Sequence, residues 1–517
     1  MAAKNFYDAV LVGLDLTTLL AGALLSKRGF RVLVIGHGQP WPSYVMHGVR
    51  FPRAPFSLRG YESPALSRVF SELAMRPIIQ RRTRPLTPAF QVVLPGHRID
   101  FGRDEQALQH ELTREFPVAR RFVDELRAAS RDSGAQLDRL LERDLMWPPE
   151  GFFERREFAR AAGSTPFATR TGTETAHNDE RETAILHAEV DGARPVAKLL
   201  ELAIRTIDGA DQPAEFSARS LRLLDSLMTS AELDEGGLSG LFELLIESIR
   251  THNGSLRVAE RVDGLTVKRG TINSLHLFPS DEDIGCHYLL WGLPVSRLGA
   301  LLADRSELAP LFEDVGEPRA AYARFTLNLL LDAAAIPEGM ARRVLLLGDD
   351  PNNDPLWVQT ENTPDGQHAI LTTEARIELR GNDARPPQLA DQRERMLARL
   401  HALSPFLQEH LQLIDSPHDG VPAYDVRGQS TFEIRDGSRR GPDTMETVYA
   451  YPRTRIQGAA ALTVRTPIKR LFLCNGQVVP GLGLEGTFVA AWSAARAVTR
   501  SLNRDWMNRG RWTKVEL

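Results

Sequence analysis

A strand–helix–strand unit near the start of the chain most constrains what it can fold into. Residues 9–12 are an apolar run typical of a buried strand, and residues 16–28 carry leucine and alanine at helical spacing. Gly29 ends this helix, and residues 31–35 form a second apolar run rich in β-branched side chains. Two strands joined by a helix within roughly thirty residues pair in parallel with a right-handed crossover. The sequence therefore predicts an α/β fold built on a parallel sheet.

Composition restricts the class of protein and its partners. The chain has 517 residues and a net charge of −4, so it exceeds one typical core and lacks the charge of a nucleic-acid-binding protein. Its two cysteines, Cys286 and Cys474, are far apart in sequence, which favours a reducing compartment over a disulfide framework. No apolar stretch is long enough to cross a bilayer, and the chain runs directly into a core strand. We therefore expect a cytoplasmic protein with no transmembrane segment and no nucleic acid partner.

The middle and end of the chain predict further strands of both kinds. Residues 90–94 and 97–101 flank Pro95-Gly96, which indicates a hairpin. Residues 471–474 predict a last strand, followed by a glycine-rich loop and a closing helix over residues 487–502. Four strand-like runs separated by turn residues predict an antiparallel sheet: 321–331, 343–347, 356–360 and 368–373.

Other segments are predicted to be helical or irregular. Residues 387–413 are expected to form one long helix that is broken near Ser404-Pro405, and residues 150–191 are polar, poorly patterned and expected to be irregular. The acidic run 349–354 lacks the closing Glu of a calcium loop, so we expect a solvated turn. The histidines show no metal-ligand spacing, and no metal site is predicted.

These segments predict two domains, each discontinuous in sequence. The first is a Rossmann-type nucleotide-binding domain over residues 1–105, 230–303 and 455–502. The second is a substrate-type α+β domain over residues 106–229 and 304–454. The tail, residues 503–517, interleaves tryptophan and methionine with basic residues. It is expected to dock on its own domain, and peripheral contact with a membrane surface is the alternative.

The turn after the first strand lacks most of the glycines of a dinucleotide-binding loop. The motif G-x-G-x-x-G lets the backbone approach a pyrophosphate closely, but residues 13–18 are GLDLTT and only Gly13 matches. A carboxylate at Asp15, about 4 Å from a phosphate, costs roughly 4 kcal/mol at an effective dielectric near 20. That is on the order of a thousandfold in affinity. Asp15 can instead cap the helix, whereas the hydroxyls of Thr17 and Thr18 leave phosphate binding open.

The end of the second strand lacks a further expected group. An acidic residue usually stands there and binds the ribose of the nucleotide. Here the strand is followed by Gly36, His37 and Gly38. A contact between His37 and a ribose is one interpretation, and a flexible turn is the favoured one.

Four segments together resemble the flavin-dependent amine oxidase and phytoene (carotenoid) desaturase superfamily. They are the N-terminal unit, FQVVLPGHRIDF with HELTREFP, EGGL with RVAERVDGLTVKRGTI, and RLFLCNGQVVPGLGLEGTFVAAWSAARAV. The last is the most specific, because in the family a strand, a Gly-Asp pair and a Pro-Gly run open a helix. The resemblance implies a Rossmann-type FAD/NAD(P)-binding domain with an inserted α+β substrate domain that combines an antiparallel sheet with helices.

The resemblance also implies FAD contacts at named positions. Gly237 belongs to the segment that returns to the FAD domain, and Val262 matches the position whose backbone meets adenine. Gly476 stands where the family has the Asp that binds the ribityl chain. The remaining glycines could offer N–H groups to the flavin or a phosphate, or persist for close backbone packing: Gly481, Gly483 and Gly486.

Three cofactor contacts are thus missing together, which predicts a degenerate FAD site and a pseudoenzyme that binds a hydrophobic small molecule, a lipid or a protein partner. Rab GDP-dissociation inhibitors are a precedent within the resembled superfamily. The alternative is an active FAD-dependent oxidoreductase acting on an apolar polyene, isoprenoid or lipid-like substrate, in which the flavin carries the chemistry. A subunit of a larger assembly is a third hypothesis. No catalytic residue is predicted.

Overall fold

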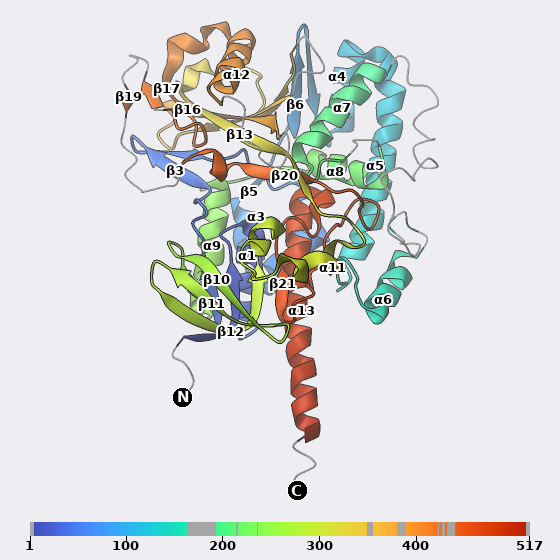
Figure 1. The fold of residues 1–517 in the computed structure, drawn as a ribbon. Helices are drawn as coiled ribbons and strands as arrows, with labels where there is room; N and C mark the ends of the chain where they lie inside the picture. Colours follow the sequence, from blue (N-terminus) through green and yellow to red (C-terminus); the bar gives the residue numbers. More distant parts are fainter. Residues whose placement is uncertain are drawn as a thin grey trace.

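The computed structural model has two sheets, one above the other in Figure 1, with helices packed around them. It describes residues 5–163, 165, 167, 193–212, 216–234, 236–348, 355–379, 389–421, 423–425, 430–431 and 440–512.

The first sheet contains the predicted strand–helix–strand unit. Its strand order is β10-β11-β12-β1-β2-β9, with β21 beside β12. The strands β9, β2, β1, β12 and β21 run parallel, and β10 and β11 are added antiparallel. Their bounds are β1 Phe6–Val12, β2 Val32–Ile35, β9 Ser255–Arg257, β10 Arg261–Lys268, β11 Thr271–Phe278, β12 Glu282–Trp291 and β21 Leu471–Leu473.

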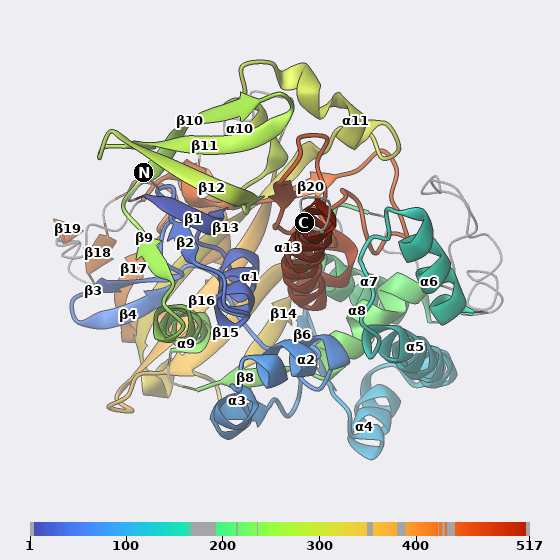
Figure 2. The ribbon, with the colours of Figure 1, turned by 90° about the horizontal axis from the view of Figure 1, so that it is seen from below.

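Helix α1 (Leu16–Lys27) lies between this sheet and two helices from distant parts of the chain. Figure 2 shows α9 (Gly237–Thr251) and α13 (Gly483–Trp512) on either side of it. Every residue of α1 from Leu16 to Ser26 is buried. A helix that is apolar on all sides requires such enclosure, which explains why this segment has no polar face.

The second sheet belongs mostly to the predicted substrate-type region. Its order is β19-β18-β17-β13-β16-β15-β14-β6-β7, with β20 beside β13. The predicted hairpin is confirmed as β6 and β7, and the four strand-like runs are confirmed as β13 to β16. The bounds are β6 Phe90–Leu94, β7 His97–Phe101, β13 Arg319–Asp332, β14 Arg343–Leu346, β15 Leu356–Asn362, β16 His368–Glu378, β17 Leu411–Asp415, β18 Ala423–Asp425, β19 Ser430–Thr431 and β20 Glu446–Ala450. Because β6 pairs with β14, residues 90–101 lie in this sheet, although the sequence predicts them in the first domain. The division of the chain into two domains stays a prediction.

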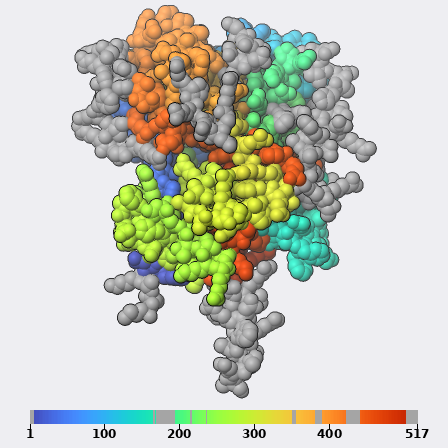
Figure 3. Space-filling model, in the orientation of Figure 1, coloured from blue at the N-terminus to red at the C-terminus, as the bar shows by residue number. Residues whose placement is uncertain are grey.

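The remaining elements surround the two sheets. On the face in Figure 3, the yellow segment that includes α10 and α11 covers the junction between the sheets. The other helices are α2 Pro64–Glu72, α3 Arg76–Arg82, α4 Glu105–Glu115, α5 Arg120–Leu141, α6 Phe152–Ala162, α7 Arg194–Ile207, α8 Ala218–Met228, α10 Val295–Gly299, α11 Ala309–Phe312 and α12 Leu389–Leu403. The other strands form two short pairs, β3 Ser43–Met46 with β4 Val49–Pro52 and β5 Thr83–Pro85 with β8 Ala231–Leu233.

Two segment predictions are wrong. The expected long helix over residues 387–413 is α12, a short 3-10 helix over Pro405–His410, and then β17. Pro405 removes a backbone donor and restricts Ser404, so the chain leaves the helix and pairs with β13. The segment expected to be irregular begins with α6, and the N–H groups of the two residues before this helix, Glu150 and Gly151, donate to the carboxylate of Glu154. The acidic run 349–354 and most of residues 164–192 lie outside the described residues.

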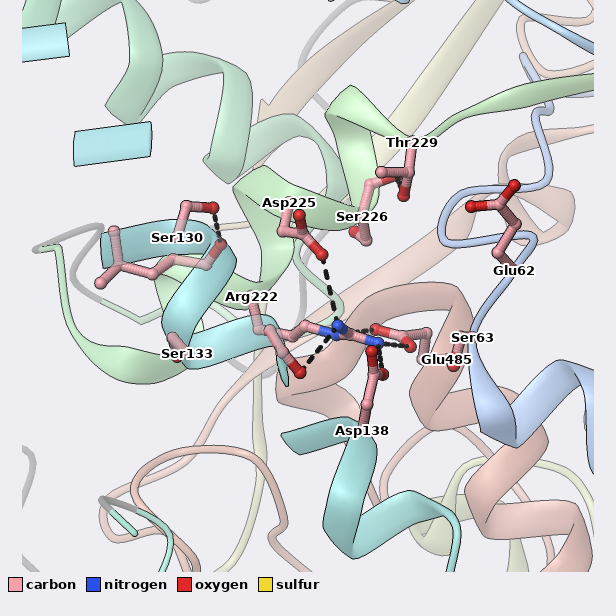
Figure 4. Close-up of polar contacts among 12 residues, drawn as sticks. Glu62, Ser63, Ser130, Ser133, Asp138, Arg222, Asp225, Ser226, Thr229 and Glu485 are labelled. Carbon is pink, nitrogen blue, oxygen red and sulfur yellow. Dashed lines mark hydrogen bonds and ion pairs between the residues drawn. The ribbon is translucent and has the colours of Figure 1, made fainter. Parts of the chain in front are cut away.

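A buried ion-pair cluster ties the start of α13 to α8 and α5, as Figure 4 shows. The guanidinium of Arg222 donates to both carboxylate oxygens of Glu485, with Nε to Oε2 at 2.8 Å and Nη2 to Oε1 at 2.5 Å. It also reaches Asp138 at 2.7 Å and Asp225 at 3.3 Å. The side chains of Arg222 and Glu485 are only 3% and 1% exposed. Burial raises the pKa of Asp225 to about 6, and the charges of Glu485 and Asp138 act in the same direction. Three carboxylates thus share the one positive charge of Arg222.

We predict that Arg222→Met lowers the free energy of unfolding by about 3–5 kcal/mol, because it leaves the Glu485 carboxylate buried without its partner. Urea unfolding followed by circular dichroism measures this loss. The double variant with Glu485→Gln should recover part of it. As a control, Arg121→Met removes an exposed ion pair within one helix and should change stability by about 0.3–0.5 kcal/mol. Equal losses in the two single variants would contradict the assignment.

Candidate functional site

A cavity of about 890 Å³ lies between the two sheets. The loop after β1 and residues 39–42 line one end, and β13 and β16 line the other. The glycine-rich loop before α13 lines the wall between them. The cavity therefore joins the segments predicted to hold a cofactor to the sheet predicted to hold a substrate, and its size is typical of a small-molecule site.

The loop after β1 uses its polar groups within the chain. Asp15 is the N-cap of α1, because its Oδ1 accepts from the Thr18 N–H at 3.0 Å and its Oδ2 accepts from the Thr18 hydroxyl at 2.7 Å. This confirms the predicted capping role. The N–H of Leu14 donates to Oε1 of Gln39. Burial raises the pKa of the Asp15 carboxyl, and hydrogen bonds from Thr18 and then Thr17 oppose the shift.

The turn after β2 is also held by contacts within the chain. A Cβ at Gly36 would lie 2.4 Å from the Val258 carbonyl oxygen, so the chains approach too closely for another residue. His37 has a left-handed backbone with φ 51°, and its Nδ1 accepts from the Val262 N–H at 3.0 Å. His37 does lie in a turn, but its side chain is fixed by this bond. Sequence reasoning missed the bond, because the two residues are 225 positions apart.

The glycines before and within the first turn of α13 differ in how much space surrounds them. A Cβ at Gly481 or Gly486 would lie 2.0 Å from a backbone carbonyl oxygen, and one at Gly483 would lie 2.9 Å from the Ile207 oxygen. Close packing therefore accounts for all three. Gly476 lies on the cavity wall with nothing within 4 Å of an added Cβ.

The neighbours of Gly476 are held by their own hydrogen bonds. The Asn475 amide donates to the Leu293 oxygen at 2.6 Å and accepts from the Gln477 N–H at 3.0 Å. The side chain of Gln477 in turn accepts from the Val295 N–H at 2.8 Å. These bonds fix the loop against the segment that follows β12.

Only some of the predicted site residues meet at the cavity. Those that line it are Asp15, Thr17, Gly476 and Gly483. Gly13 has φ 139° and turns the chain from β1 toward α1, and Thr18 is buried against Asp15. Gly237 has φ 55° at the first residue of α9, where nothing lies within 4 Å of an added Cβ.

The opposite wall carries arginines that the sequence analysis did not select. Arg53, Arg59 and Arg324 line the cavity with Glu374. Arg324 is held by Glu374 Oε1 at 2.8 Å and by two backbone carbonyl oxygens. A signal existed in the strand ARFTLNLLLD, since Arg324 and Thr326 alternate with apolar residues. Such a period of two places them on one face of the strand.

The electrostatic character of this wall is visible in two pKa shifts. Burial and then Arg324 lower the pKa of Arg59 to about 10. Burial and then Arg53 lower the pKa of His418 to about 3, and Arg440 acts in the same direction. Both shifts disfavour positive charge, first because the groups are buried and second because neighbouring arginines repel them.

The described part of the chain has neither a cluster of metal ligands nor a helix that could span a membrane. No group of three His, Cys, Asp or Glu residues there could hold a metal ion. Cys286 and Cys474 are buried and free. Among the helices described, none is long and apolar enough to cross a membrane.

Comparison with solved structures identifies the fold. Neither a family model nor a curated protein matches the sequence. Cyclohexylamine oxidase from Brevibacterium oxydans matches over 96% of this chain and 99% of its own, with a TM-score of 0.55 and 15% identity. Putrescine oxidase bound to putrescine matches over 96% and 99%, with a TM-score of 0.54 and 13% identity. An oxidoreductase from Methanosarcina mazei matches over 95% and 100%, with a TM-score of 0.53 and 13% identity.

The chain has the fold of the amine oxidases. The resemblance inferred from the four sequence segments is therefore confirmed at the level of the fold, a Rossmann-type domain with an inserted α+β region. At these identities the likeness extends to architecture and not to the chemistry of the site.

We predict that His418 makes stability depend on pH between about 6.5 and 3. An unfolded histidine takes up a proton below pH 6.5, but the buried His418 resists protonation until about pH 3. The folded state therefore loses stability as pH falls through this window, by up to about 1.4 kcal/mol per pH unit. His418→Gln removes this contribution, so the stability gap between wild type and variant should shrink from pH 7 to pH 4. Urea titrations at several pH values measure it, and a constant gap would refute the prediction.

Proposed function

We propose that this amine-oxidase-fold protein does not hold FAD in the usual manner of the fold and acts by binding a ligand in the cavity between its sheets. The observation that carries the proposal is the use of the nucleotide-facing donors by the chain itself. The N–H of Thr18 donates a hydrogen bond to Asp15, and the N–H of Leu14 donates one to Gln39. The N–H of Val262 donates one to His37.

The pyrophosphate of FAD fits poorly at the start of α1. Such a group needs free N–H donors at a helix N-terminus and a close approach to the backbone. Here the carboxylate of Asp15 occupies the end of the helix and already satisfies a first-turn donor. Its raised pKa weakens the repulsion of a phosphate but leaves the space filled.

The adenosine and ribityl portions lose their expected contacts as well. The superfamily resemblance assigns the backbone of Val262 to adenine. Its N–H instead donates to the imidazole of His37. Gly476 supplies no carboxylate for the ribityl chain. Three separate portions of one cofactor are affected, and this coincidence supports a changed function more strongly than any single loss.

An active FAD-dependent oxidoreductase on an apolar polyene, isoprenoid or lipid-like substrate is the second candidate. The cavity favours it in one respect, because it runs without a break from the loop after β1 to β13. If bound, the flavin would supply the redox chemistry, and Gly476 is the predicted site residue on an open part of the cavity wall. A protein partner of this chain stays a prediction.

Flavin content tests the proposal. The purified chain should be colourless, and added FAD should cause no saturable change in flavin fluorescence at micromolar concentrations. The combined variant Asp15→Gly, His37→Glu and Gly476→Asp should raise FAD affinity by at least about tenfold, equivalent to about 1.4 kcal/mol. Stoichiometric FAD in the wild-type preparation would sink the proposal.

A matched control separates the removal of charge from the loss of a helix cap. Asp104 is the N-cap of α4, which does not line the cavity. Asp104→Gly should lower stability by an amount similar to Asp15→Gly, a few tenths of a kcal/mol, without any gain in FAD affinity. A gain in both variants would show that the FAD response is not specific to the cofactor site.

A further inference from the structure

We propose that the cavity ligand is a monoanionic carboxylate with an apolar body, whose carboxylate lies against Arg59, Arg324 and Thr326. This inference rests on the proposed function, since it names the class of ligand that the cavity takes. It is argued from the polar groups that the cavity wall leaves unsatisfied.

Polar atoms of three residues on this wall are buried and make no hydrogen bond among the described residues. They are the Nε atoms of Arg59 and Arg324 and the hydroxyl of Thr326. Thr326 as a whole is only 1% exposed. Buried donors without acceptors are costly, so an acceptor is expected beside them.

Arg324 gives the wall its fixed geometry. Glu374 and the carbonyl oxygens of Thr206 and Asp208 hold its guanidinium. Thr326 is two residues further along β13, on the same face of the strand, and both residues line the cavity. A ligand group would therefore meet a preorganised surface.

The balance of charge around Arg59 favours one added negative charge. Arg324 and Arg343 act on its guanidinium as like charges, and Glu374 and Glu446 act as opposite charges. Glu374 is committed to Arg324 at 2.8 Å, and the side chain of Glu446 is 66% exposed. After these pairings Arg59 keeps an uncompensated charge. A carboxylate matches an arginine fork in both charge and shape.

One part of the remaining lining is apolar and suits an apolar body, although the lining as a whole also carries polar side chains. Trp41 and Phe242 meet edge to face, with ring centroids 5.7 Å apart, and both line the cavity. Leu238, Phe56 and Trp357 also line it. Apolar walls with few polar groups that set orientation are typical of small-molecule sites. At the position assigned to the carboxylate, the charge of a cationic amine would meet Arg59 and Arg324.

Three probes with the same chain and different head groups test the inference: dodecanoate, dodecanol and dodecylamine, each below its micelle concentration. Quenching of tryptophan fluorescence by their ω-bromo derivatives follows entry, since Trp41 and Trp357 line the cavity. Wild type should bind dodecanoate at least about tenfold more tightly than the other two, the discrimination expected of a charge-assisted contact. Equal affinity for all three, or a preference for dodecylamine, would overturn the inference. Dodecyl phosphate that binds about tenfold more tightly than dodecanoate would overturn the choice of a carboxylate.

The variant Arg59→Met separates a ligand role from a structural one. It should abolish the preference for dodecanoate while leaving the thermal midpoint of the ligand-free protein unchanged or higher, because it removes a buried charge that lacks a counter-charge. Thr326→Val should weaken dodecanoate binding by a smaller factor. Arg297→Met, at another arginine of the cavity lining, is the matched control and should keep the preference. A lower midpoint for Arg59→Met with unchanged preference would assign Arg59 to folding alone.

The outcome for the ligand is separate from the outcome for the cofactor. Stoichiometric flavin together with a preference for dodecanoate would reject the proposed function and keep the anionic ligand. A colourless protein without head-group preference would reject the ligand class alone.

Discussion

The position of the cavity wall depends on the buried ion pair between Arg222 and Glu485. Glu485 lies in the first turn of α13, which begins at Gly483 directly after the loop that carries Gly476. Arg222 holds it from α8, and α5 contributes Asp138 to the same guanidinium. Charges buried this deeply tolerate little displacement, because each must keep its partner. The loop is therefore placed by an interaction outside the first sheet, and the shape of the cavity follows from the docking of the helical region.

The cofactor region and the ligand region of the cavity differ in how they satisfy their polar groups. At the loop after β1, side chains turn back and bond to nearby backbone, as Asp15 does with Thr18. At β13, Arg324 is fixed but Thr326 keeps an unpartnered hydroxyl. At one end of the cavity the chain's own groups accept from the backbone donors, and at the other end donors are left without an acceptor. The groups that a ligand could satisfy therefore lie at the second sheet and not at the nucleotide end.

Local pattern predicted the elements well, and distance in sequence limited the prediction of the site. The strand–helix–strand unit, the hairpin and the antiparallel strands followed from apolar periodicity and turn residues, which act over a few positions. The cap on α1 was also predictable, since Asp15 and Thr18 are three residues apart. The bond between His37 and Val262 joins two segments that only the folded sheet brings together. The pairing of Arg324 with Glu374 depends on strand register, which the sequence pattern does not specify.

The enclosure of α1 has a consequence for the order in which the protein can be made. This helix spans Leu16–Lys27, and it leaves the ribosome long before one of its covering helices, α13, which begins at Gly483. Domains fold as units during synthesis, and contacts between distant segments slow folding. The apolar surface of α1 that faces α13 thus stays uncovered while the residues between the two helices are synthesised. The first sheet can close only after β21 and α13 have been synthesised.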